Sequence, residues 1–228
     1  MAHRPIFLPL SSETTFVRTV SVEFKWHAGM SVSQKQKSIA SLHETAITKG
    51  LSKSPFEISS KSESPLGVQL SAFNLRFKAS DWGFGCVETA FQGSKVFEFG
   101  GPYSDLYNAI ARAAKKDERL QNSGKLVAFN FMGEGWPLQP QTLFYDWLYL
   151  NALNQNQDLA KKIHEYDGFT DIEFNPKKSI NCQAYSAALY ISLANEGKLV
   201  EALRGYEGYR KLIEARVGKG RGQQASLF

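Results

Sequence analysis

The segment CVETAFQGSKVFEFGG (residues 86–101) reads as a single helix that ends at the glycine pair. At about 100° per residue, Glu88, Gln92 and Lys95 lie on one side of this helix, beside an apolar stripe. A polar row at the border of an apolar stripe is typical of a helix that faces a cleft. A solvated charged face is the alternative, although Glu88 and Lys95 are about 10 Å apart along the axis, too far for an i,i+4 ion pair.

The chain around this segment combines a few strand patterns with a larger number of helix patterns. Residues 15–27 and 125–133 are rich in β-branched and aromatic types and are predicted as strands, and a short strand opens 56–67. Apolar periodicity and caps predict helices at 31–50, 105–120, 142–153, 157–167, 182–197 and 199–216. The predicted fold class is therefore α+β and helix-dominated.

The composition of the connecting segments divides the chain into three parts. A Ser/Pro-rich loop separates a strand/helix extension, residues 1–64, from the main body, residues 65–216. We expect the extension to pack on the main body, and the basic tail at 217–228 to be mobile. Residues 80–85 are expected to form a tight loop that leads into the helix of the opening segment.

The overall composition indicates a globular protein with an anionic partner. The chain has 228 residues, is 43% hydrophobic and carries a net charge of +5, which favours nucleic acid, a nucleotide or a phosphorylated substrate. Two cysteines without a CxxC pattern suggest free thiols in a reducing compartment. The N-terminus does not resemble a signal peptide, and no run is long enough to cross a membrane. We therefore expect a cytoplasmic protein without membrane contact, monomeric or weakly associated.

Familiar catalytic motifs are missing from the sequence. It has no GxSxG elbow and no GxxxxGK[ST] phosphate loop. The four histidines are scattered and do not have the spacing of metal ligands. The expectation is an activity that uses neither a metal ion nor a cofactor.

Three segments resemble motifs of the NADAR family. VETAFQGSKVF (87–97) resembles the signature helix, with its valine, glutamate, glutamine and lysine in the same order. LSAFNLRF (70–77) resembles the Leu-Ser-Asn-Phe segment, except that Ala72 stands where the asparagine often is, and Asn74 follows it. The resemblance implies a NADAR-like single domain and chemistry on NAD-derived or ADP-ribose groups.

The third segment, FTDIEFNPKKSINCQAYSAAL (169–189), resembles the closing motif through Asp171, Phe174 and Asn181. It departs from the family where Phe174-Asn175 replaces the usual Trp-Gly. From about residue 5 to 195, the chain resembles the NADAR branch that is paired with DarT-type DNA ADP-ribosyltransferase toxins. That resemblance implies an antitoxin that hydrolyses the N-glycosidic bond between ADP-ribose and guanine bases in DNA and releases ADP-ribose. The alternatives are an N-glycosidase for a riboflavin-pathway phosphoribosyl-pyrimidine and a non-catalytic ADP-ribose-binding antitoxin.

This reaction assigns candidate roles to three ionisable residues. Cleavage of an N-glycoside develops positive charge at the ribose anomeric carbon and requires proton transfers. Glu88 is the first choice for both tasks. Lys95 either pairs with the diphosphate or forms a Schiff base with the ring-opened sugar, and Asp171 either orients Lys95, activates water or simply caps a loop.

Polar and aromatic residues are candidates for holding ADP-ribose, although each also suits an ordinary structural role. The predicted binding residues are Asn74, Trp82, Phe91, Gln92, Phe174 and Asn181. Phe84 and Trp136 are further stacking candidates, and Arg112, Lys115 and Lys116 are candidates for phosphate contact or for a solvated helix face.

The N-terminal extension is the expected contact surface for DNA, single-stranded in the first instance. Lys25, Trp26, Lys35 and Lys37 interleave basic side chains with an aromatic ring, a combination that suits single-stranded nucleic acid.

Overall fold

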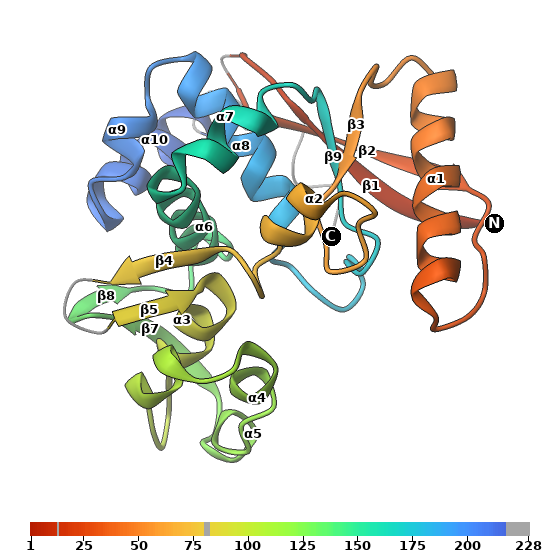
Figure 1. Ribbon diagram of the computed structural model, residues 1–228. Coiled ribbons are helices and arrows are strands. Elements are labelled where there is room, and N and C mark those ends of the chain that lie inside the picture. Colours follow the sequence, from red (N-terminus) through yellow and green to blue (C-terminus); the bar gives the residue numbers. More distant parts are fainter. Residues whose placement is uncertain (13, 80–82, 218–228) are drawn as a thin grey trace.

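The computed structural model describes residues 1–12, 14–79 and 83–217 (Figure 1). It confirms a helix-dominated α+β fold. The largest sheet combines β1 (Ala2–Pro9), β2 (Val17–Phe24), β3 (Pro55–Glu57) and β9 (Gly168–Thr170), in the order β2-β1-β9-β3. Strands from residues 1–64 thus share one sheet with a strand from the main body.

Strand β9 is the link between the two parts of the chain. Phe169 pairs with Phe7 of β1 in antiparallel register and with Phe56 of β3 in parallel register. The strand is short, Gly168–Thr170, and lies at the start of the segment that resembles the closing motif. The division of the chain at residue 64 stays a prediction.

The two faces of this sheet are covered by different helices. Ile6 and Leu8 of β1 point into a cluster with Leu42 of α1 (Val32–Thr48), whereas Phe7 packs edge-to-face on Tyr185 of α8 (Gln183–Asn195) at 5.7 Å between ring centroids. This alternation follows from the two-residue period of a strand. Helix α1 begins where predicted, because the Ser31 hydroxyl accepts a hydrogen bond from the Gln34 amide.

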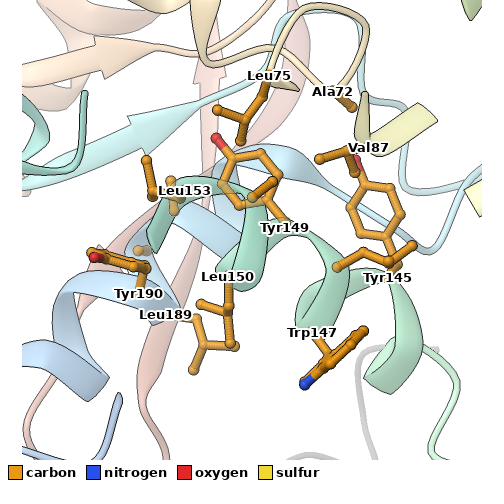
Figure 2. Close-up of a cluster of buried hydrophobic side chains, with 14 of the residues drawn as sticks. Ala72, Leu75, Val87, Tyr145, Trp147, Tyr149, Leu150, Leu153, Leu189 and Tyr190 are labelled. Carbon is orange, nitrogen blue, oxygen red and sulfur yellow. The ribbon is translucent and has the colours of Figure 1, made fainter. Parts of the chain in front are cut away.

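Helix α6 (Leu143–Gln155) is the centre of the larger core. Figure 2 shows Tyr145 and Tyr149 of α6 pointing toward Ala72, Leu75 and Val87. The Tyr149 hydroxyl donates a hydrogen bond to the Leu70 carbonyl at 2.9 Å. The helices that complete this part of the fold are α2 (Pro65–Gln69), α7 (Gln157–Ile163), α9 (Leu199–Ala202) and α10 (Tyr206–Val217).

The remaining elements lie below α6 in Figure 1 and surround α3 (Val87–Gly93). Strands β4 (Arg76–Ala79) and β5 (Gly83–Cys86) form an antiparallel pair. A second antiparallel sheet contains β6 (Lys95–Phe97), β7 (Leu126–Phe131) and β8 (Glu134–Trp136). The expected loop at 80–85 is wrong for its last residues, since β5 begins at Gly83.

The prediction of one helix over 86–101 was wrong. Helix α3 ends at Gly93, and Lys95 begins strand β6, where it pairs with Phe129. A Cβ atom on Gly93 would lie 2.6 Å from the ring of Tyr107, so the chain comes closer to its neighbour here than any other residue permits. Lys95 therefore does not lie on the helix face that carries Glu88.

The predicted helix at 105–120 was also wrong. This stretch instead contains a 3₁₀ turn (Ser104–Asn108) and two short helices, α4 (Ala111–Lys115) and α5 (Arg119–Asn122). The backbone is extended between the first two, at Ala109 and Ile110. Packing of Leu106 and Tyr107 in the core outweighs the helical propensity of this alanine-rich segment.

A buried carboxyl group in α6 gives the fold a pH-dependent stability. Asp146 is 2% exposed, and the Ser186 hydroxyl donates a hydrogen bond to it at 2.5 Å. Burial raises the pKa of Asp146 from 3.8 to about 7. The folded protein thus binds one more proton than the unfolded chain between these values, and its unfolding free energy falls as the pH rises through this window.

We expect Asp146→Asn to be more stable than the parent at pH 8, by on the order of 3 kcal/mol, and similar to it near pH 4. Urea denaturation at both pH values measures this difference. The exposed Asp158→Asn is the matched control and should leave the pH dependence unchanged. If the unfolding free energies of Asp146→Asn and the parent change with pH in the same way, Asp146 is not the source of the pH dependence.

Candidate functional site

A cleft of about 1310 Å³ opens between α3 and α4 on one side and the loops that follow β3, α2 and β9 on the other. Seven of the predicted catalytic and binding residues line it: Asn74, Glu88, Phe91, Gln92, Asp171, Phe174 and Asn181. Three separate segments of the sequence therefore contribute to a single site.

Backbone hydrogen bonds hold two of these segments together. The Glu88 amide donates to the Ala72 carbonyl at 2.9 Å, and the Val87 amide donates to the Leu75 carbonyl at 3.1 Å. The start of α3 is thus fixed against the loop after α2. In Figure 2, Val87 lies above Tyr145 of α6, which supports this corner from below.

Glu88 is a buried carboxylate on the α3 side of the cleft. The residue is 6% exposed, and its Oε1 accepts a hydrogen bond from Gln92 Nε2 at 2.9 Å. Lys115 Nζ of α4 lies 3.7 Å from the same oxygen. Gln92 Oε1 is buried and has no hydrogen-bond donor among the described residues. A ligand hydroxyl or amine in the cleft would satisfy this acceptor.

Lys95 lies beside Glu88 but is not part of the cleft lining in the described structure. Its Nζ is 5.0 Å from the ring centroid of Phe91, which does line the cleft. Burial lowers the pKa of Lys95 and nearby Lys115 lowers it further, whereas Glu88 opposes the shift. A lowered pKa increases the fraction of neutral amine, the form that acts as a nucleophile.

Asp171 occupies the opposite wall and is held by three donors. Its Oδ1 accepts the amides of Glu173 and Phe174 at 3.0 and 3.2 Å, and its Oδ2 accepts Gln183 Nε2 at 3.0 Å. Burial raises the pKa of Asp171, and the neighbouring carboxyl group of Glu57 raises it further.

Gln183 was not predicted as a site residue, yet it connects three segments around Asp171. Its amide group also donates to the Ile58 carbonyl at 2.7 Å and accepts from the Ala72 amide at 2.6 Å. No local sequence pattern distinguishes it from other glutamines near the start of a helix.

The asparagines behave differently from each other. The Asn74 amide group donates to Val68 O and Ser71 Oγ, so it stabilises the turn after α2. Asn181 is not the N-cap of α8, because Cys182 has that position. Its Oδ1 is buried without a donor among the described residues and, like Gln92 Oε1, is free to accept a hydrogen bond from a ligand.

The aromatic candidates fall into three groups. Phe91 and Phe174 line the cleft. Trp136 is wrong as a stacking candidate, because it is 1% exposed and packs on Trp147 in the core. Trp82 lies outside the described residues, and so does the side chain of Phe84.

Basic side chains occur on both lips of the cleft. Arg112, Lys115 and Lys116 of the α4 region line one lip, Lys61 of the loop after β3 lines the other, and Arg76 of β4 is also part of the lining. The last two were missed, since each is a single basic residue without a neighbouring pattern. The arrangement suits a ligand with several phosphates.

The predicted nucleic-acid residues lie on α1 and in the loop between β2 and α1. Trp26 is half-buried, with the Arg4 guanidinium 5.3 Å and Lys35 Nζ 4.9 Å from its ring. Lys35 also forms an ion pair with Glu173 at 3.0 Å, and Glu173 lines the cleft. This patch therefore continues into the mouth of the cleft. Lys25 and Lys37 are exposed.

Among the described residues, no group of three or more His, Cys, Asp or Glu side chains is arranged to hold a metal ion. Within residues 1–12, 14–79 and 83–217, no helix has the length and apolar character needed to span a bilayer.

Comparison with known proteins agrees with the motifs that line the cleft. A family model described as the DarT1-associated NADAR antitoxin matches residues 2–222, which is nearly the whole chain. Among curated proteins no match is found. The chain belongs to the family of DarT1-associated NADAR antitoxins.

Proposed function

We propose that this antitoxin is an ADP-ribosylhydrolase that cleaves the N-glycosidic bond between ADP-ribose and guanine bases in DNA. Its family links it to a DarT toxin, and the reaction would reverse the modification made by that toxin. The observation that carries the proposal is the buried carboxylate of Glu88 on the wall of a cleft with basic lips.

The cleft has the complementary groups that ADP-ribose requires. The basic lips suit the diphosphate, the two unpaired amide oxygens of Gln92 and Asn181 suit ribose hydroxyls or amines, and the rings of Phe91 and Phe174 suit a base. Glu88 stabilises positive charge at the anomeric carbon, and Asp171 on the other wall serves as the base that activates water.

Lys95 supplies the nucleophile in this proposal. Its neutral amine displaces the base at the anomeric carbon, and one amine proton passes to the departing guanine nitrogen. The remaining N–H proton moves to the ring oxygen as the sugar opens, which leaves an imine between Nζ and the anomeric carbon. Water then adds, the amine leaves and free ADP-ribose is released. In this proposal, rotation about the side-chain bonds of Lys95 carries Nζ from the face of the Phe91 ring into the cleft.

A direct test uses a DNA oligonucleotide with ADP-ribosylated guanine and follows the masses of the oligonucleotide and the released product. We expect unmodified oligonucleotide and free ADP-ribose. An oligonucleotide that stays modified while the protein remains bound to it would instead identify an ADP-ribose-binding antitoxin.

The patch around Trp26 is proposed to bind the DNA strand next to the modified base. The double charge reversal Lys35→Glu/Lys37→Glu is expected to weaken binding of the modified oligonucleotide on the order of ten-fold or more at low salt, with a smaller salt dependence. Affinity for free ADP-ribose should change much less, because this ligand does not reach the patch.

Fluorescence anisotropy with labelled oligonucleotide and calorimetry with ADP-ribose measure the two affinities. Lys49→Glu is the matched control, since Lys49 is an exposed residue at the other end of α1, about 18 Å from Lys37. Equal losses for both ligands would count against a separate DNA contact.

A further inference from the structure

A chain of polar side chains lies behind the cleft wall that carries Asp171. Thr170 of β9 is fully buried, and its hydroxyl donates to Glu57 Oε2 of β3 at 2.6 Å. The Ile172 amide donates to Glu57 Oε1 at 2.8 Å. His43 Nε2 of α1 lies 2.8 Å from Thr170 Oγ1. None of Glu57, Thr170 and His43 has a role in the reaction proposed above.

The geometry of this chain fixes the position of Asp171. Thr170 and Ile172 are its two neighbours in sequence, and both are bonded to Glu57, which is 3% exposed. Glu57 therefore holds the Thr170 side chain on one side of Asp171 and the Ile172 backbone on the other, while Gln183 holds the carboxyl group itself. A change at Glu57 would reach the cleft through this short segment.

The hydrogen-bonded row of His43, Thr170 and Glu57 can hold its protons in two arrangements. In one, a doubly protonated His43 donates through Nε2 to Thr170, and Thr170 donates to an ionised Glu57. In the other, Glu57 carries the proton and donates to Thr170, whose own proton points to a bare Nε2 of neutral His43. Moving two protons along the chain interconverts them without a change in total charge. Burial lowers the pKa of His43 to about 4 and raises that of Glu57, whereas the hydrogen bonds from the Ile172 amide and the Thr170 hydroxyl stabilise ionised Glu57 and oppose the rise in its pKa.

We propose that Glu57, coupled to His43 through Thr170, is a positioning residue that fixes Asp171 at the cleft wall and governs whether Asp171 carries a proton. The role of Asp171 as a base rests on the proposed function. Ionised Glu57 places a second negative charge beside Asp171 and favours its protonated form, whereas neutral Glu57 leaves Asp171 free to ionise.

Other charged or ionisable groups also face this pair from the elements packed around it. They are Arg4 of β1, Glu173 of the loop after β9, Cys182 at the start of α8, and Tyr145 and Tyr149 of α6. The positive charge of Arg4 partly offsets the negative charges of Asp171 and Glu173. Among the described residues, the only ionisable group that is hydrogen-bonded to Glu57 through Thr170 is His43.

The test is the titration of the Asp171 carboxyl carbon by NMR, without substrate, in the parent and in Glu57→Gln. We expect the midpoint to fall by about one pH unit in Glu57→Gln, because the second charge is removed while the shape is kept. Thr170→Val is expected to move it in the same direction, since Glu57 without its hydroxyl donor stays protonated. Glu44→Gln, an exposed carboxyl next to His43, is the matched control.

The pH–rate profile of ADP-ribose release is measured on the same proteins. Its acid limb should move to lower pH together with the Asp171 midpoint. An unchanged midpoint in a folded Glu57→Gln or Thr170→Val protein overturns the role of Glu57, whether or not the parent is active. If the midpoint shifts but the parent protein releases no ADP-ribose, the positioning role of Glu57 is supported and the proposed hydrolysis is refuted.

Discussion

Glu88→Gln is expected to lower the rate of ADP-ribose release from modified DNA by about 10²–10⁴-fold and to leave ADP-ribose binding within a few-fold of the parent. Glutamine has the same shape, and its side-chain oxygen still accepts from Gln92 Nε2. It lacks the negative charge that stabilises the anomeric carbon as the base departs. The loss should therefore fall on the chemical step and not on affinity.

Single-turnover kinetics with excess protein measures the rate, and calorimetry measures the affinity. Glu118→Gln, an exposed carboxyl group outside the cleft, is the control. Protection of cells from the toxin should fall with the rate. If Glu88→Gln protects as well as the parent, the protein acts by binding ADP-ribose or the toxin.

Lys95→Arg is expected to abolish a covalent intermediate and to reduce ADP-ribose release by on the order of 10³-fold. Arginine keeps the positive charge beside Phe91 and Glu88, but its guanidinium stays protonated and does not form the imine. Borohydride should trap a protein–ADP-ribose adduct in the parent and none in the variant, as measured by intact-protein mass.

Lys95→Arg separates the two candidate roles of Lys95, because the variant keeps the positive charge and removes the nucleophilic amine. Lys125→Arg, an exposed lysine close in the chain to β7, is the control and should trap normally. If Lys95→Arg remains active and the parent gives no adduct, Lys95 is a fixed charge for the diphosphate.

Segments with strong local signals were predicted correctly from the sequence. Helices α6 and α8 contain long runs of apolar residues, and α1 has a serine N-cap. The cleft residues from α3 and the loop after β9 were found because their motifs resemble those of a known family. Each of these signals lies within one short stretch of chain.

Features that depend on contacts between distant segments were missed. Helix α3 ends at Gly93 because Tyr107 packs against it, and the sequence around Gly93 contains no stronger helix-stop signal than the later glycine pair. Lys61 and Arg76 become part of the cleft lining only when the chain folds. Gln183 and Glu57 are likewise defined by what they contact across more than 100 residues.

The position of β9 between β1 and β3 has a consequence for biosynthesis. The N-terminal hairpin and β3 are translated early, but the strand that joins them, Gly168–Thr170, is synthesised only when about three quarters of the chain has been made. Until then the edge of β1 is unpaired and available to other chains. A product truncated before residue 168 lacks the strand that covers this edge of β1.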